Sequence, residues 1–82
     1  MVHGRVQGVF FRDTCRREAR RLGVTGFVRN VGDGTVEAVF EGDPDAVSTM
    51  VDWAHVGPDR AQVVRVDVAE EEPEGLTDFE VR

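Results

Sequence analysis

The chain has 82 residues, of which 40% are hydrophobic, and a formal net charge of -6. This length suits one domain covering residues 1–82, and no apolar stretch approaches the roughly 18 to 20 residues that cross a bilayer. No basic segment followed by an apolar one opens the sequence, so we expect a cytoplasmic protein without a membrane partner. A single cysteine, Cys15, excludes an internal disulfide, and two histidines offer no set of metal ligands.

Charge is divided unevenly along the chain. Residues 1–30 carry seven Arg against Asp13 and Glu18, whereas residues 31–82 carry three Arg against fourteen carboxylates. We therefore expect an anionic ligand to be attracted to the N-terminal third. All ten basic residues are Arg and none is Lys, so residue type alone does not mark any one Arg as functional.

The first half of the chain predicts a strand, a helix and a hairpin. Val2 and His3 form a short strand that leads into a loop with a glycine at each end, Gly4 to Gly8. Apolar residues at helical spacing follow and end at Gly23, which should stop the helix: Phe11, Cys15, Ala19 and Leu22. Residues 24–30 and 35–40 suit strands, and the glycine-rich residues 31–34 suit the turn between them.

The second half predicts one more helix and two strands. Asp43 followed by Pro44 is typical of a helix start, and Gly57-Pro58 of its end. Between them lies one apolar stripe: Val47, Met50, Val51 and Ala54. Val64, Val66 and Val68 alternate with polar residues, which predicts a half-buried strand, and residues 79–81 suit a short last strand.

The predicted order of elements is β-α-β-β-α-β-β. Each of the two helices must bury its apolar stripe against a sheet, and this order allows both to do so on the same face. We therefore predict an α+β, ferredoxin-like sandwich. Its sheet would be antiparallel, with two helices on one face and a short extra C-terminal strand.

The segment from Gly4 to Arg12 is the best candidate for a ligand site. Glycines let backbone N–H groups converge, a helix start presents unpaired donors, and Arg12 adds a planar fork of donors. This combination suits phosphate. A tight strand-to-helix turn beside a solvated Arg is the alternative, and spacing alone favours it, because the segment lacks the Gly-Lys-Ser or Gly-Lys-Thr of the Walker pattern.

A resemblance to a known family favours the phosphate site over the tight turn. The segment Gly4-Arg5-Val6-Gln7-Gly8-Val9-Phe10-Phe11-Arg12 resembles the acylphosphatase signature G-x-V-Q-G-V-x-F-R at every specified position. A second signature follows in register, as Gly26-Phe27-Val28-Arg29-Asn30, then Gly34-Thr35-Val36, then Gly42. The resemblance extends over almost the whole chain.

The resemblance implies an enzyme that hydrolyses acyl phosphates to a carboxylate and inorganic phosphate, with no metal and no other cofactor. Arg12 and Asn30 would be the catalytic residues, Arg12 binding the phosphate and Asn30 orienting the attacking water. Backbone N–H groups of the loop would cradle the same phosphate: Arg5, Val6, Gln7, Gly8 and Val9. From the residues alone, a turn former before a glycine-rich turn is the favoured interpretation of Asn30.

Two other functions remain open at this point. An RNA-recognition module shares the β-α-β-β order, but residues 36–40 lie in an acidic region and the chain has no Tyr, so we expect no nucleic-acid partner. A non-catalytic anion-binding or regulatory acylphosphatase-like domain, of the kind found in hydrogenase-maturation factors, is the second alternative.

The sequence departs from the family pattern at its start. Only Met1, Val2 and His3 precede Gly4, where family members usually carry several more residues that form a central first strand. A shortened central strand would lower stability and could invite strand addition by another chain. With that reservation we expect a monomer.

Overall fold

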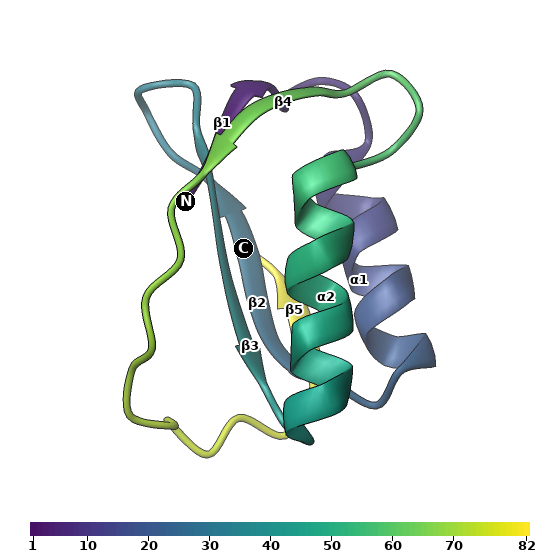
Figure 1. The fold of residues 1–82 in the computed structure, drawn as a ribbon, viewed down its shortest axis with the longest axis vertical. Helices are drawn as coiled ribbons and strands as arrows, with labels where there is room; N and C mark the ends of the chain where they lie inside the picture. The colour runs from purple at the N-terminus through teal and green to yellow at the C-terminus, as the bar shows by residue number, and fades with distance from the viewer.

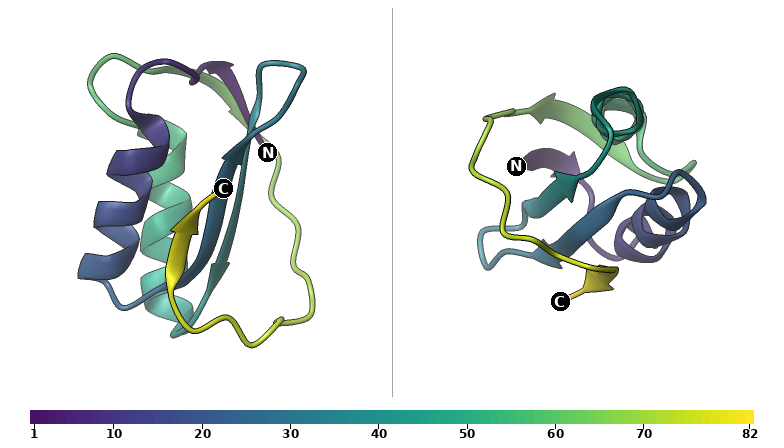
Figure 2. Two further views of the ribbon diagram at one scale, coloured as in Figure 1. Left: turned by 180° about the vertical axis from the view of Figure 1, so that it is seen from behind. Right: turned by 90° about the horizontal axis from the view of Figure 1, so that it is seen from below.

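The computed structural model describes residues 1–82 as one five-stranded sheet with two helices. Both helices cover the same face of the sheet (Figures 1 and 2). None of the helices is long and apolar enough to span a membrane. In chain order the elements are β1 (Val2–Arg5), α1 (Phe11–Arg21), β2 (Thr25–Asn30), β3 (Val36–Glu41), α2 (Pro44–Val56), β4 (Gln62–Val66) and β5 (Phe79–Val81).

The strands lie in the order β4-β1-β3-β2-β5. This is the predicted ferredoxin-like arrangement with one added strand at the edge. The first four strands pair antiparallel, but β5 pairs parallel with β2, and Phe79 lies opposite Gly26. The prediction of an antiparallel sheet was therefore wrong in this detail. The segment between β4 and β5 runs back along the side away from the helices and reaches the end of the sheet at which β2 begins (Figure 1).

A single carboxylate fixes this returning segment. Glu41, at the end of β3, accepts hydrogen bonds from the backbone N–H groups of Glu74 at 3.0 Å and of Gly75 and Leu76 at 3.1 Å. Charge-assisted bonds of this kind are stronger than neutral ones. They bring the chain to Phe79, which is fully buried and stacks on Phe40 with ring centroids 5.9 Å apart.

The core lies between the helices and the sheet, and the predicted helix stripes supply much of it. Cys15 and Met50 are fully buried, one from each helix. Burial raises the pKa of the Cys15 thiol to about 12, so the thiol stays protonated and acts as a packing group. The predicted start of α2 is confirmed, because the Asp43 carboxylate accepts the backbone N–H of Asp45 at 2.9 Å.

The predicted alternation in β4 was wrong. Val64 is 80% exposed and Val68, beyond the strand, is 60% exposed, whereas Val63 and Val66 are partly buried against the core. The cause is a β-bulge. His3 of β1 pairs with Arg65 but Gly4 pairs with Val63, so Val64 is an extra residue. An extra residue in one strand reverses the side to which the following side chains point.

Gly4 lies within β1 at this bulge and not in the following loop. Its φ is 128°, and a Cβ added there would lie 2.0 Å from the carbonyl oxygen of Gln62. Gly4 therefore permits the close approach of β4, and it is not one of the loop glycines that free the N–H groups to converge.

Replacing this glycine tests the close approach. We expect Gly4→Ala to lower the free energy of unfolding by about 2 kcal/mol or more, because the side chain would combine backbone strain with a clash against β4. Gly32→Ala is the matched control, since its Cβ would meet nothing within 4 Å and its φ is not positive. Urea unfolding followed by Trp53 fluorescence measures both, and equal stabilities of the two variants would contradict this role.

Candidate active site

A pocket of about 300 Å³ lies at the N-terminal end of α1. It brings together the two predicted catalytic residues, Arg12 from the first turn of α1 and Asn30 from the end of β2. Of the predicted phosphate-binding residues, Val6 and Gly8 line it, whereas Arg5, Gln7 and Val9 do not. The remaining lining residues are Phe10, Phe11, Asp13 and Val81.

Unpaired backbone donors run along one side of this pocket. The N-cap residue of α1, Phe10, makes no side-chain capping hydrogen bond. No backbone N–H between Val6 and Asp13 donates to another backbone group. These donors add to the partial positive charge of the helix start, and such an end is suited to bind an anion.

The backbone of the loop is turned by two residues in the left-handed region. Gly8 has φ 72° and Phe10 has φ 59°. Alternation of right- and left-handed residues turns successive N–H groups toward one point and forms a concave anion site. Arg5 lies just before this turn, in β1 opposite Gln62.

Arg12 has no carboxylate partner. Its Nη1 donates one long hydrogen bond, 3.4 Å, to the carbonyl oxygen of Arg82 just after β5, which holds the side chain at the pocket. Three other arginines of α1, Arg16, Arg20 and Arg21, lie beside carboxylates, whereas Arg17 does not. Arg20 lies 3.0 Å from Asp78 and Arg21 lies 2.8 Å from Glu18. The guanidinium of Arg12 thus keeps most of its donors for a ligand.

Asn30 carries the one buried polar side-chain atom without a hydrogen-bond partner, Oδ1. The residue ends β2 opposite Val36 of β3 and lines the pocket. Leaving a buried acceptor unsatisfied costs about 1 to 3 kcal/mol, so such a group calls for an explanation. Because the residue also lines the pocket that holds Arg12, its side-chain amide can hydrogen-bond to a small molecule such as water.

The side chain of Gln7 joins the loop to the hairpin that carries Asn30. Its Nε2 donates to the carbonyl oxygens of Val31 and Thr35, both at 2.9 Å. Sequence reasoning considered only the backbone of Gln7 and missed this contact. The signal was present in the signature, which specifies Gln at a position where a backbone role alone would admit other residues.

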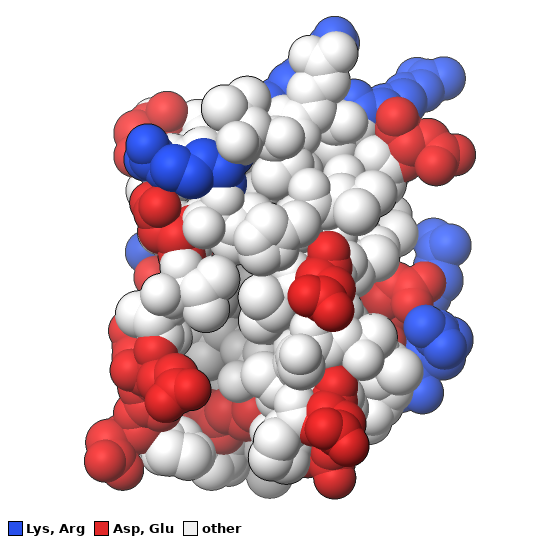
Figure 3. All heavy atoms as spheres, in the orientation of Figure 1, with Lys and Arg blue, Asp and Glu red and all other residues white.

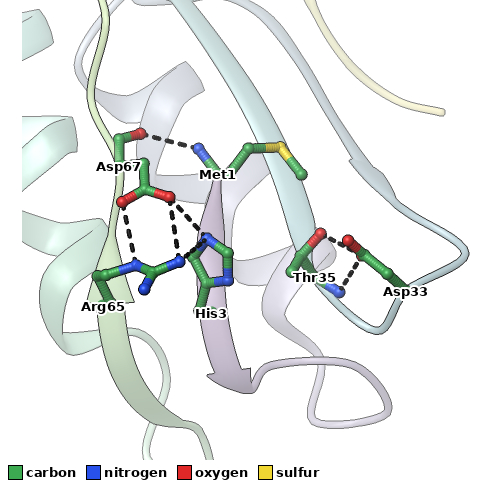
Figure 4. Close-up of polar contacts among 6 residues, drawn as sticks. All are labelled: Met1, His3, Asp33, Thr35, Arg65 and Asp67. Carbon is green, nitrogen blue, oxygen red and sulfur yellow. Dashed lines mark hydrogen bonds and ion pairs between the residues drawn. The ribbon is translucent and has the colours of Figure 1, made fainter.

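Asp33 holds the same hairpin turn from within (Figure 4). Its Oδ1 accepts from the hydroxyl of Thr35 at 2.6 Å and from the backbone N–H of Thr35 at 3.0 Å. The hydroxyl bond is the main cause that lowers the pKa of Asp33 below its ordinary value of 3.8. The turn after Asn30 is thereby held by Gln7 from the loop and by Asp33 from within the hairpin.

A second polar cluster lies outside the pocket, where β1 meets the end of β4 (Figure 4). The His3 Nε2 lies 2.8 Å from Asp67 Oδ2, and the Arg65 Nε lies 3.1 Å from Asp67 Oδ1. The His3 hydrogen bond is the main cause that lowers the pKa of Asp67. No group of three or more His, Cys, Asp or Glu side chains is arranged to hold a metal ion.

Charged side chains are unevenly spread over the surface, although Arg and carboxylates also lie side by side at both edges of this view (Figure 3). Carboxylates lie over the face of α2, while guanidinium groups gather at the edge where α1 lies (Figure 3). Arg16, Arg17 and Arg20 line a second hollow on α1 together with Asp13. Asp13 also lines the first pocket, a carboxylate that the sequence analysis did not place there, and it lies 4.0 Å from Arg16.

Comparisons with known proteins agree with one another. The family model of acylphosphatase matches residues 1–81. An acylphosphatase of Thermococcus kodakarensis is 61% identical over 80 residues, which are 98% of this chain and 88% of that protein. One of Rubrobacter xylanophilus is 60% identical in an alignment that covers 99% of this chain and 74% of that protein.

Solved structures give the same picture. An acylphosphatase from Coxiella burnetii superposes with a TM-score of 0.95 at 42% identity, over 99% of this chain and 85% of that one. A full-length HypF shares the fold, with a TM-score of 0.87 at 21% identity over 99% of this chain but only 11% of its own. On the family match and these identities, the chain belongs to the acylphosphatase family.

Proposed function

We propose that this chain hydrolyses acyl phosphates at the pocket beside α1, without a metal ion. Water and the acyl phosphate give a carboxylate, inorganic phosphate and a proton, with cleavage of the bond between phosphorus and the acyl oxygen. Relatives named acylphosphatase support the reaction. The observation that carries the assignment to this pocket is that Arg12, Asn30 and the run of unpaired backbone N–H groups all meet there.

In this proposal the phosphate lies in the concave loop. N–H groups from Val6 to Val9, which have no backbone acceptor, would bind its oxygens. Arg5 was expected to contribute as well, and its place in β1 puts it at the margin of this cradle. Arg12 would bind two oxygens of the same group with its planar fork and offset the charge that spreads over the phosphoryl oxygens in the transition state.

Asn30 would orient the attacking water. Its side-chain amide lines the pocket and would hydrogen-bond to that water, in line with the acyl oxygen that leaves. No general acid is needed to protonate the leaving group, because a carboxylate with a pKa near 4 leaves readily as an anion. A phosphate oxygen of the substrate can take the proton of the water. The protein then contributes position and charge stabilisation.

Location and assembly are proposed from composition and family alone. We expect a cytoplasmic, monomeric protein of one domain, residues 1–82, whose partner is a small acyl phosphate. We expect no binding of single-stranded RNA, since residues 36–40 lie in an acidic region and the chain has no Tyr.

The substitution Arg12→Lys tests the phosphate contact. Hydrolysis of benzoyl phosphate by the parent should be the same with and without excess EDTA. We expect Arg12→Lys to lower kcat/KM by about 10²-fold or more, because the single ammonium group loses the bidentate geometry. Arg17→Lys, the same change on an exposed residue of α1 outside the pocket, should leave the rate unchanged.

Three outcomes would count against this assignment. Turnover of Arg12→Lys near that of the parent would remove Arg12 from the phosphate site. Loss of parental activity in EDTA would refute the metal-free reaction. A folded parent that binds inorganic phosphate without hydrolysing benzoyl phosphate would establish the alternative, a non-catalytic anion-binding domain.

The substitution Asn30→Ala separates a water-orienting residue from a turn former. We expect kcat to fall by about 10²-fold with no loss of stability in urea, because the change deletes an acceptor that has no partner in the fold. Asp33→Ala is the comparison, since it removes two hydrogen bonds inside the turn but does not line the pocket. It should lower stability with little change in kcat. The reverse pattern would make Asn30 the turn former.

A further inference from the structure

Phe10 is an exposed aromatic residue at the mouth of the pocket. It lines the pocket together with Val81, and 73% of its surface is open to solvent. The other large exposed hydrophobic residues, Val56, Val64 and Val68, line no part of it. Single exposed apolar residues are common on protein surfaces, and Phe10 differs from them because its ring lies in the lining of the pocket.

The backbone of Phe10 adds a second cost. Phe10 is the one non-glycine residue with positive φ, and every other such position is a glycine. A bulky residue in the left-handed region is rare and strained. Strain of this kind gathers at functional sites, where the surrounding structure holds it in place. At this position the Phe side chain exposes an apolar surface and strains the backbone, and a glycine would do neither.

The lining of the pocket has two chemical characters. The polar part consists of the loop N–H groups, Arg12, Asp13 and Asn30. The apolar part that is open to solvent consists of Phe10 and Val81. An acyl phosphate has the same two parts. With the phosphoryl group bound by the loop, the acyl group would extend toward the exposed part of the lining, to which Phe10 and Val81 belong.

We propose that Phe10, with Val81, binds the acyl group and makes this chain prefer acyl phosphates with an aromatic or extended apolar acyl group over acetyl phosphate. This inference rests on the proposed function. The ring offers a flat apolar surface that an aromatic acyl group can cover, and aromatic pairs gain more than their buried area alone. The methyl group of acetyl phosphate would cover little of the ring surface. The family signature leaves residue 10 unspecified, so the residue here is free to determine specificity.

The experiment compares benzoyl phosphate with acetyl phosphate in the parent and in variants at residue 10. We expect Phe10→Ala and Phe10→Gly to lower the ratio of the two kcat/KM values by about tenfold, mainly through KM for benzoyl phosphate. Phe10→Tyr should retain the parental ratio. Val64→Ala, at an equally exposed apolar residue on β4, is the matched control and should leave the ratio unchanged.

Competitive inhibition by inorganic phosphate distinguishes binding of the acyl group from support of the loop. Phosphate has no acyl group, so its inhibition constant should stay the same in all the variants. An unchanged ratio in Phe10→Ala would overturn the inference, and so would an equal loss for both substrates together with weaker phosphate inhibition. A parent that hydrolyses neither substrate would instead refute the proposed function itself, which separates the two failures.

Discussion

Two hydrogen bonds from one side chain hold the halves of the candidate site together. The loop and Arg12 follow β1, whereas Asn30 ends β2, and β1 touches the hairpin of β2 and β3 through a single register pair, Val2 with Val36. The Gln7 Nε2 extends this contact by binding the carbonyl oxygens of Val31 and Thr35. A misplacement of about 1 Å between catalytic groups costs activity heavily, so this link matters for turnover as well as for the fold.

The unfavourable features of the molecule gather at the same place. Loop N–H groups without acceptors, the unpaired Oδ1 of Asn30 and the left-handed Phe10 all lie around one pocket. Elsewhere, carboxylates accept hydrogen bonds from free backbone N–H groups. Asp43 accepts one at the start of α2, and Glu41 accepts another from the segment before β5. Proteins tolerate local conflict with folding where function requires it, and this distribution supports the site independently of any family resemblance.

Local signals in the sequence predicted the elements well, and tertiary pairing accounts for the errors. Apolar spacing, Gly23 and Asp43 place the two helices because helix ends depend on nearby residues. The bulge at Val64 and the parallel pairing of β5 depend on other strands, so alternation along the chain could not reveal them. For the same reason the Gln7 contact was missed. Spacing alone favoured a tight strand-to-helix turn without a ligand at Gly4 to Arg12, and only the resemblance singled out Arg12 and Asn30.

The proposed reaction depends on the binding of phosphate by the backbone of the loop before α1. A titration of the ¹⁵N-labelled protein with inorganic phosphate, followed in ¹H–¹⁵N correlation spectra, tests it most directly. We expect saturable shifts that are largest at the N–H groups of residues 6–13, with the side chain of Arg12 shifting in parallel. Largest shifts at Arg16, Arg17 and Arg20, with the loop unchanged, would place the anion on the exposed face of α1 and rule out the loop as the phosphate site.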